Sequence, residues 1–356
     1  MAPLVLVAAL ALGSSPDALG LLRRQCTTWA STPKNPWALA HGLRAFGASF
    51  RATDGRLATA ALLHDTFGRD GFPAFLPDGT PVEPHPNLLT KTLVCDVGLP
   101  STTRLETAWG SITVQVLVDR VMREFKRPAN AAEWGALGWT LDVLAATQVP
   151  GARWQTSDGA LVSIDQLFDD ALDELERETG ELNEGRERGL PQVDKRPTGI
   201  YAQPCGGLHF VQGVLAWARH PAVRAHWGPR VDRQVAILVY RLGSERRQYE
   251  AALTLARRAA PGLTPRVLAQ QLKFYGHFLE TAARWRAELG WTPRGGDLAA
   301  VSTAKQLLRQ TAEALEERGT FAAMPRLAVD QPQLFLDLIG DSCHAAWALG
   351  AWEAAR

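Results

Sequence analysis

Four histidines stand in segments rich in small residues, and two of them have an acidic residue three positions away. His277 precedes Glu280, and Asp341 precedes His344, each by three residues. In a helix this spacing places both side chains on one face, where they can ligate a metal ion or act as an acid–base pair. We therefore predict that His277, Glu280, Asp341 and His344 are the catalytic residues.

Two further histidines, His41 and His209, occupy similar segments. His209, His277 and His344 recur at separations of 68 and 67 residues, as expected for equivalent positions of a repeated unit. Side chains at equivalent positions can converge on one axis, so we predict that His41 and His209 bind substrate. The alternative is that each histidine is a hydrogen-bonded core residue which the repeat has copied.

Cysteine and histidine also occur together. Cys205 is followed by two glycines, and Cys343 is adjacent to His344. Two thiolates and an imidazole are a sufficient protein ligand set for zinc with an open fourth position. The competing hypothesis is a Cys205–Cys343 disulfide. With Cys26 and Cys95 the chain has four cysteines, which can pair in three ways, and the sequence does not choose among them. Export would favour disulfides, whereas a cytosolic chain would keep buried thiols.

This arrangement resembles the lanthionine-cyclase family, which are α/α toroids whose zinc is held by one Cys and a later Cys-His pair. The tripeptide Ala40-His41-Gly42, with Gly47 after it, is similar to that family's A-H-G motif. The chain departs from the family at Ala345, where the family has glycine, and in the separation of 138 positions between Cys205 and Cys343, which is much too long. The resemblance implies zinc at Cys205, Cys343 and His344.

Acidic turns offer a second kind of site. Asp54 and Asp158 stand in matching Asp-Gly turns, and paired carboxylates can hydrolyse glycosides. Trp139 and Trp285 lie near such turns and could stack on sugar rings, so we predict that these four residues bind substrate. The alternative is that Asp-Gly is ordinary helix capping and that the tryptophans pack in the core.

The elements that must position these residues are almost all helical. Five segments combine small residues with aromatic ones, namely 37–47, 134–146, 206–217, 275–285 and 341–352. Helical hairpins that repeat stack side by side, because one hairpin cannot bury its own apolar face. Strand signals are nearly absent. The pattern predicts an all-α fold and favours a closed α/α toroid over an open α-solenoid or an irregular helical bundle.

Capping signals predict where several helices begin. Asn35 followed by Pro36 combines an N-cap with proline at the first helical position. Separate helices are also expected over 230–241 and 245–259. The i, i+3 capping-box spacing recurs at Thr103 and Glu106 for a helix reaching about residue 126, at Asn130 and Glu133, and at Ser163 and Gln166.

The chain reads as one domain over 21–356, preceded by a signal peptide over 1–20. Its apolar run over 3–12 is ten residues long, too short to span a bilayer but typical of a signal peptide. Long loops at 67–102 and 180–207 are expected to cover the site. Thirty-eight basic against 37 acidic residues give a net charge of +1, which argues against nucleic-acid binding.

These patterns favour an exported enzyme in the periplasm or outside the cell, with a cytoplasmic location as the alternative. We expect a hydrolase or lyase for a glycan or peptidic cell-envelope substrate, working by acid–base or metal-assisted chemistry at the toroid mouth. The alternative is a non-catalytic scaffold with structural histidines. A zinc-dependent lanthionine-cyclase-like enzyme, or an isoprenoid enzyme that uses Asp142, is less favoured.

Overall fold

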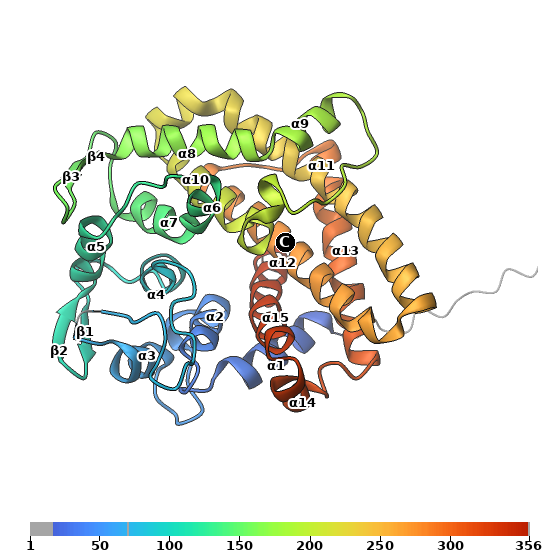
Figure 1. The fold of residues 1–356 in the computed structure, drawn as a ribbon, viewed down its shortest axis with the longest axis horizontal. Helices are drawn as coiled ribbons and strands as arrows, with labels where there is room; N and C mark the ends of the chain where they lie inside the picture. Colours follow the sequence, from blue (N-terminus) through green and yellow to red (C-terminus); the bar gives the residue numbers. More distant parts are fainter. Residues whose placement is uncertain (1–16, 70, 355–356) are drawn as a thin grey trace, which may run out of the picture.

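The computed structural model describes residues 17–69 and 71–354, and most of them are helical (Figure 1). The all-α prediction is therefore confirmed at the level of fold class. Positions 1–16, which carry most of the predicted signal peptide, lie outside the described residues. The helices are α1 Ala18–Ala30, α2 Pro36–Phe46, α3 Ala58–Thr66, α4 Leu88–Lys91, α5 Val114–Arg123, α6 Ala131–Ala136, α7 Gly138–Thr147, α8 Ile164–Glu178, α9 Gly180–Glu187, α10 Leu208–Ala216, α11 Pro221–Ala259, α12 Thr264–Leu289, α13 Gly295–Glu317, α14 Met324–Asp330 and α15 Pro332–Glu353.

Five helices near the middle of the molecule contact one another in sequence around the site. Helix α2 packs against α15, α15 against α12, α12 against α10, and α10 against α7. Helix α4 and the π-helical turn η2 (Thr92–Asp96) lie between α7 and α2 and contact both. The helices expected to carry the site residues are thus neighbours in space.

The other helices pack on the outside of this group. Helix α1 contacts α15 and α2, α13 contacts α12, and α8 contacts α10. The acidic α8 also faces the basic α11, where Arg230 pairs with Glu176 at 2.8 Å and the Trp227 indole donates to Asp169 at 2.9 Å. The oppositely charged segments therefore neutralise each other within one chain.

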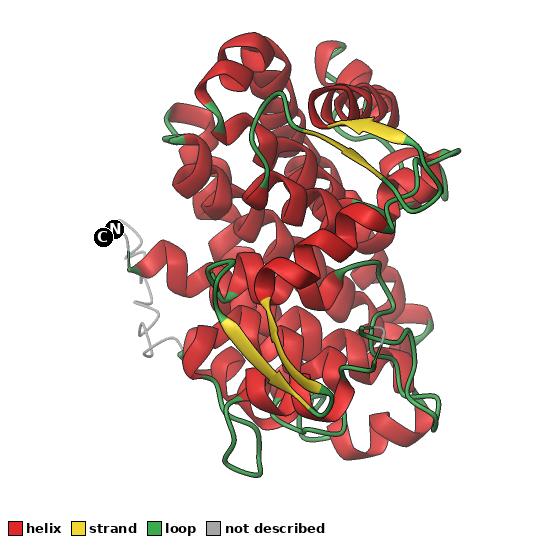
Figure 2. Cartoon of the chain, turned by 90° about the vertical axis from the view of Figure 1, so that its left-hand side faces the viewer, coloured by secondary structure: helices red, strands yellow, loops and turns green. Residues whose placement is uncertain are grey.

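Two short hairpins interrupt the helices (Figure 2). Strand β1 (Arg104–Thr107) pairs with β2 (Gly110–Thr113), and β3 (Arg153–Gln155) pairs with β4 (Leu161–Ser163), both antiparallel. The capping box predicted at Thr103 and Glu106 is therefore wrong. Gly110 has φ +116°, which only glycine adopts without strain, and the chain reverses there so that α5 starts at Val114.

Two other capping predictions are confirmed by side-chain hydrogen bonds. The Asn35 side chain accepts from the Ala38 amide at 3.0 Å, and that of Asn130 accepts from the Glu133 amide at 3.1 Å. Ser163 stands just before α8, but its hydroxyl makes no capping bond.

The two helices expected over 230–241 and 245–259 are one continuous helix, α11, of 39 residues. Arg241 and Glu245 bridge the expected break with a buried i, i+4 ion pair of 2.7 Å. The helix thus continues through Gly243, a residue that alone would weaken it. Among the described residues, no helix is both long and apolar enough to cross a membrane.

Small residues let the inner helices approach closely, as the sequence suggested. A Cβ atom placed on Gly213 of α10 would lie 2.3 Å from the carbonyl oxygen of Gly138 in α7. One placed on Gly138 would lie 2.7 Å from the backbone of His209. Glycine at both positions is therefore required by backbone contact between two helices.

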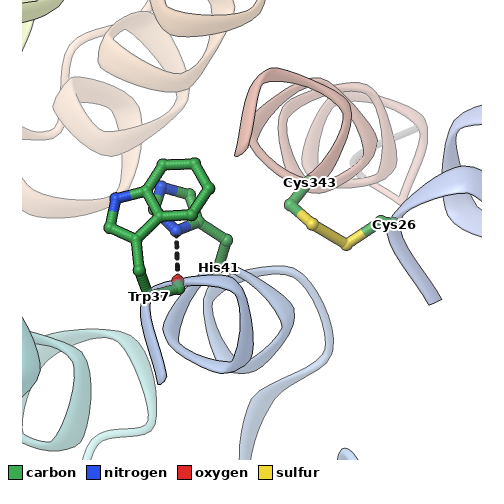
Figure 3. Close-up of a disulfide and its surroundings, with 4 residues drawn as sticks. All are labelled: Cys26, Trp37, His41 and Cys343. Atoms are coloured by element: carbon green, nitrogen blue, oxygen red, sulfur yellow. Dashed lines mark hydrogen bonds between the residues drawn. A yellow bond between two sulfur atoms is a disulfide. The ribbon is translucent and has the colours of Figure 1, made fainter. Parts of the chain in front are cut away.

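A disulfide joins Cys26 of α1 to Cys343 of α15, with 4.9 Å between their Cα atoms (Figure 3). The predicted alternative of a Cys205–Cys343 disulfide is therefore wrong. Helices α1 and α15 pack along each other, which brings two residues 317 positions apart into contact. Cys95 and Cys205 remain free thiols.

Candidate functional site

A cavity of about 350 Å³ lies where α2, α10, α12 and α15 meet. One histidine from each of these helices lines it: His41, His209, His277 and His344. Residues from 81–96 and from 204–205 also line it, together with Trp139 of α7, so part of each predicted loop contributes. A cavity of this size accommodates a small molecule or the end of a polymer.

The four imidazole rings are neighbours. The ring centroid of His277 lies 4.2 Å from that of His344 and 4.9 Å from that of His209. His41 is 5.2 Å from His344 by the same measure. The fold thus brings together the four histidines that the sequence singled out.

Three of the rings are held through Nδ1. His41 Nδ1 lies 2.7 Å from the Trp37 carbonyl oxygen (Figure 3), and His277 Nδ1 lies 2.9 Å from that of Lys273. A carbonyl can only accept, so each Nδ1 carries the proton and each Nε2 keeps a lone pair. Burial lowers the pKa of His41 well below its ordinary value and that of His277 to about 3, so both rings are neutral.

The third ring, His344, is paired with a carboxylate. Its Nδ1 lies 2.7 Å from Oε2 of Glu280, a side chain that is fully buried. Arg44 donates to the other oxygen of Glu280, with Nε at 2.8 Å, and also reaches Asp96 at 3.1 Å. Burial raises the pKa of Glu280, but His344 and Arg44 outweigh it and hold the pKa well below its usual range. Glu280 is therefore an ionised carboxylate that orients His344.

Asp341 is a second carboxyl group at the site, and its pKa is shifted in the opposite direction from that of Glu280. It lines the cavity, is buried, and its Oδ2 has no hydrogen-bond partner among the described residues. Burial raises the pKa of Asp341 well above its ordinary value, and the nearby Lys273 only partly offsets this. Lys273 is bonded to Asp337 instead, at 3.1 Å. The site thus contains one carboxyl group whose pKa is raised, Asp341, and one whose pKa is lowered, Glu280.

Cys205 brings a thiol to the same cavity. Its Sγ and one ring nitrogen each from His209 and His277 lie within 4.8 Å of one another. The Nε2 atoms of the two histidines are 3.2 Å apart. Burial raises the pKa of the Cys205 thiol to about 12, and burial lowers that of His209 well below its ordinary value.

The zinc ligand set predicted from the sequence is wrong in one member. Cys343 is bonded to Cys26, and a disulfide sulfur is not the thiolate that zinc requires. The set of Cys205, Cys343 and His344 therefore cannot form while this disulfide is present. Because Cys343 is in the disulfide, the Cys343-His344 pair no longer supports the resemblance to the lanthionine cyclases.

The predicted substrate-binding residues divide into two groups. Trp139 lines the cavity and stacks on His85, with ring centroids 4.0 Å apart. Trp285 is buried against Trp291 outside the cavity lining. Asp54 and Asp158 cap exposed turns, where they bond Arg56 and Thr156, and neither lines the cavity.

Several cavity residues were missed by the sequence reasoning. Arg44 lies three positions after His41, and Lys273 four positions before His277. Helical spacing could have found both, because residues three or four apart share a face. Lys91 and Asp96, which pair at 2.7 Å, come from the segment predicted as a loop and gave no such signal.

No protein-family model, curated protein or solved structure matches this chain.

Proposed function

We propose that this chain is a hydrolase or lyase that acts on a glycan or peptidic substrate inside the cavity. The observation that carries the proposal is the 2.7 Å contact between His344 Nδ1 and Glu280 Oε2. A carboxylate on Nδ1 fixes the tautomer of an imidazole, leaves Nε2 basic and stabilises the imidazolium that forms. His344 lines the cavity, so this base would act on a substrate bound there.

His344 and Asp341 divide the proton transfers between them. In hydrolysis, His344 Nε2 takes a proton from water as its oxygen attacks, and the protonated Asp341 gives its proton to the leaving group. In elimination, the same base takes a proton from carbon and the same acid protonates the departing oxygen. Burial raises the pKa of Asp341, whereas His344 and Arg44 lower that of Glu280, the partner of His344, and carboxyl groups displaced in opposite ways are the usual mark of divided acid and base roles.

The remaining cavity wall supports the substrate class. The ring of Trp37 offers an apolar face of the kind that stacks on sugars, whereas the buried ring of Trp139 lies between His85 and His209. Arg44, Lys91 and Lys273 line the cavity as well; each is paired with a carboxylate of the chain, and their remaining N–H groups are donors for the carboxylates of acidic sugars or peptides. Metal-assisted chemistry is compatible with the same set of histidines.

The wider arrangement supports two further parts of the proposal. The contacts that run through α2, α15, α12, α10 and α7 and return to α2 through α4 are those expected of a closed α/α toroid. The Cys26–Cys343 disulfide favours an exported protein, because disulfides persist in oxidising compartments.

A substrate screen with active-site variants tests the proposal. The full chain would be incubated with peptidoglycan fragments, other glycan oligomers and short peptides, and products would be read by mass spectrometry. Hydrolysis gives product masses that sum to the substrate plus one water, and elimination gives masses that sum to the substrate alone. We expect His344→Gln and Glu280→Gln to lower kcat by about 10²- to 10⁴-fold.

The matched control is His226→Gln, a substitution at an exposed histidine of α11. It should leave kcat unchanged, and far-UV circular dichroism should show that all three variants are folded. If no fragment is turned over, or if the cavity variants lose stability while a found activity persists, the histidines are structural. The chain is then better described as a scaffold.

A further inference from the structure

We propose that Cys205, His209 and His277 bind one transition-metal ion, with zinc the best fit, and leave a coordination position open to the cavity. This ligand set differs from the one that the sequence suggested. The inference goes beyond the proposed function, because metal binding can be measured without a substrate. Both can hold together, since a bound zinc ion lowers the pKa of a coordinated water.

The spacing of the three ligand atoms fits such an ion. The Nε2 atoms of His209 and His277 are 3.2 Å apart. A tetrahedral zinc ion with Zn–N bonds of roughly 2.0–2.1 Å would hold two nitrogens about 3.3 Å apart. Cys205 Sγ lies within 4.8 Å of one nitrogen of each ring, so the thiol belongs to the same cluster.

The His277 ring has the orientation that metal ligation requires. Its Nδ1 is bonded to the carbonyl oxygen of Lys273 at 2.9 Å, which leaves the Nε2 lone pair directed at His209. Ligating histidines almost always give their second ring N–H to a carbonyl or carboxylate in this way. His209 occupies the first turn of α10, four residues after Cys205.

The backbone that carries Cys205 is held in a conformation unusual for this residue. Cys205 has φ +51°, and Gly206 and Gly207 follow with φ +62° and +76°. A non-glycine residue in this region costs free energy and persists only where its surroundings enforce it, as they often do at functional sites. The turn directs the thiol into the cavity just before α10 begins.

Buried partners enforce that turn. Arg241 of α11 donates to the Gly206 carbonyl oxygen at 2.8 Å, and Glu245 in turn holds Arg241 at 2.7 Å. A Cβ on Gly207 would lie 2.2 Å from the Ile200 side chain, so the loop before α10 also fits closely. The thiol is therefore presented by a rigid loop, as a preformed metal site needs.

A second group of potential ligands, His277, Glu280 and His344, is less suited to a metal. Its atoms also lie within 4.8 Å of one another. However, Glu280 Oε1 already accepts from Arg44 Nε, and Oε2 lies 2.7 Å from His344 Nδ1, so each oxygen has a close partner within the chain. A thiolate with two imidazoles also matches zinc better than magnesium or calcium, which prefer oxygen ligands.

Cobalt binding tests the site directly. Full-length protein freed of metal by a chelator would be titrated with Co²⁺, which reports thiolate ligation by a near-ultraviolet charge-transfer band. We expect one equivalent to bind, with that band and visible bands of tetrahedral cobalt, and one equivalent of Zn²⁺ to abolish them. Cys205→Ser should remove the charge-transfer band, and Cys205→Ser or His209→Gln should weaken Zn²⁺ binding by about 100-fold or more.

The matched controls are Cys95→Ser, at the other free thiol, and His85→Gln, at a cavity histidine outside the ligand set. Both should bind Co²⁺ as the wild-type protein does. The proposal is overturned if the folded wild-type protein binds no Co²⁺, or if binding lacks the thiolate band. It is equally overturned if the Cys205→Ser protein binds with unchanged affinity.

A measurement on the wild-type protein covers the case in which these variants do not fold. Bound Zn²⁺ should slow alkylation of Cys205 by a thiol reagent at least about tenfold, because the metal holds the thiolate. Peptide mass spectrometry would follow Cys205, with Cys95 as the internal control whose rate should not change. Equal rates at Cys205 with and without Zn²⁺ would contradict the site whatever the variants do.

Discussion

Arg284 and Asp142 form a buried two-point ion pair that joins α12 to α7. Nη1 and Nη2 of Arg284 lie 2.8 and 2.6 Å from the two carboxylate oxygens of Asp142. Arg284 Nη1 also donates to Gln212 of α10 at 3.1 Å, so one guanidinium connects three inner helices. Asp142 does not line the cavity, and this pairing leaves it unsuited to the isoprenoid chemistry considered from the sequence.

Removing one member of this pair should destabilise the protein strongly. In Asp142→Ala the Arg284 charge stays buried without a counter-ion, and we expect a loss of about 3–5 kcal/mol in the free energy of unfolding. Denaturant titration followed by circular dichroism measures it. Asp330→Ala breaks an exposed pair with Arg326 and should cost less than about 0.5 kcal/mol. Similar losses of stability in the two variants would show that the buried ion pair contributes no more to folding than the exposed one.

The Cys26–Cys343 disulfide should stabilise the folded protein, and a count of reactive thiols should detect it. Unfolded wild-type protein should show two reactive thiols without reductant and four with it, from Cys95 and Cys205 and then Cys26 and Cys343. Reduction should lower the free energy of unfolding by about 2–5 kcal/mol, because the unfolded chain gains freedom. A Cys26→Ser/Cys343→Ser protein should start at that lower value and not respond to reductant. Four reactive thiols before reduction would contradict the pairing.

The stability of the cavity wall should depend on pH through Glu83. Burial raises the pKa of Glu83 from 4.5 to about 7, although its carboxylate accepts from the Leu89 amide at 2.8 Å. Between these values the unfolded chain loses the proton that the folded chain keeps, so stability falls as pH rises from about 4.5 to 7 and then levels off.

Glu83→Gln keeps the acceptor for Leu89 and removes the titration. The free energy of unfolding of the variant, relative to wild type, should therefore rise by about 1–3 kcal/mol between pH 4 and pH 7. Chemical denaturation at several pH values measures this difference. The exposed Glu106→Gln should show no such rise. A Glu83 difference that is constant with pH would refute the assignment.

Glycine should be required at Gly213 and dispensable at Gly243. In Gly213→Ala the new Cβ meets the Gly138 carbonyl oxygen at 2.3 Å, so α7 and α10 must separate, at a cost of about 1–3 kcal/mol. In Gly243→Ala the Cβ enters open space on an exposed face of α11, and helix propensity should add about 0.5–1 kcal/mol. Thermal melting of both variants shows whether each substitution lowers or raises the melting temperature. A stabilised Gly213→Ala would mean that the helices are not in backbone contact.

The sequence predicted the helical class and the convergence of the histidines because both follow from periodic patterns. Histidines in similar small-residue segments led to the expectation that His277 and His344 converge, and their ring centroids lie 4.2 Å apart. Capping signals were less reliable, because the same residue spacing can occur at a helix start and in a β-hairpin. Thr103 and Glu106 have capping-box spacing, yet Gly110 favours a hairpin, and pairing across that turn prevailed.

Contacts between distant segments could not be predicted. Cys343 pairs with Cys26 because α1 packs along α15, and no spacing in the sequence encodes that neighbour. Arg44 and Glu280 are 236 residues apart and meet only once α2 and α12 are in place. Asp54 and Asp158 look alike in sequence, but each sits on an exposed turn, where Arg56 and Thr156 satisfy it.

The Cys26–Cys343 bond also makes residues 26–343 a single covalent ring. That ring contains the three proposed metal ligands, together with Glu280 and Asp341. A protease that cuts the exposed connection over 188–198 would open the ring without releasing either piece. The two fragments would remain one molecule until a reductant reached the disulfide, so the walls of the cavity can survive a break in the backbone.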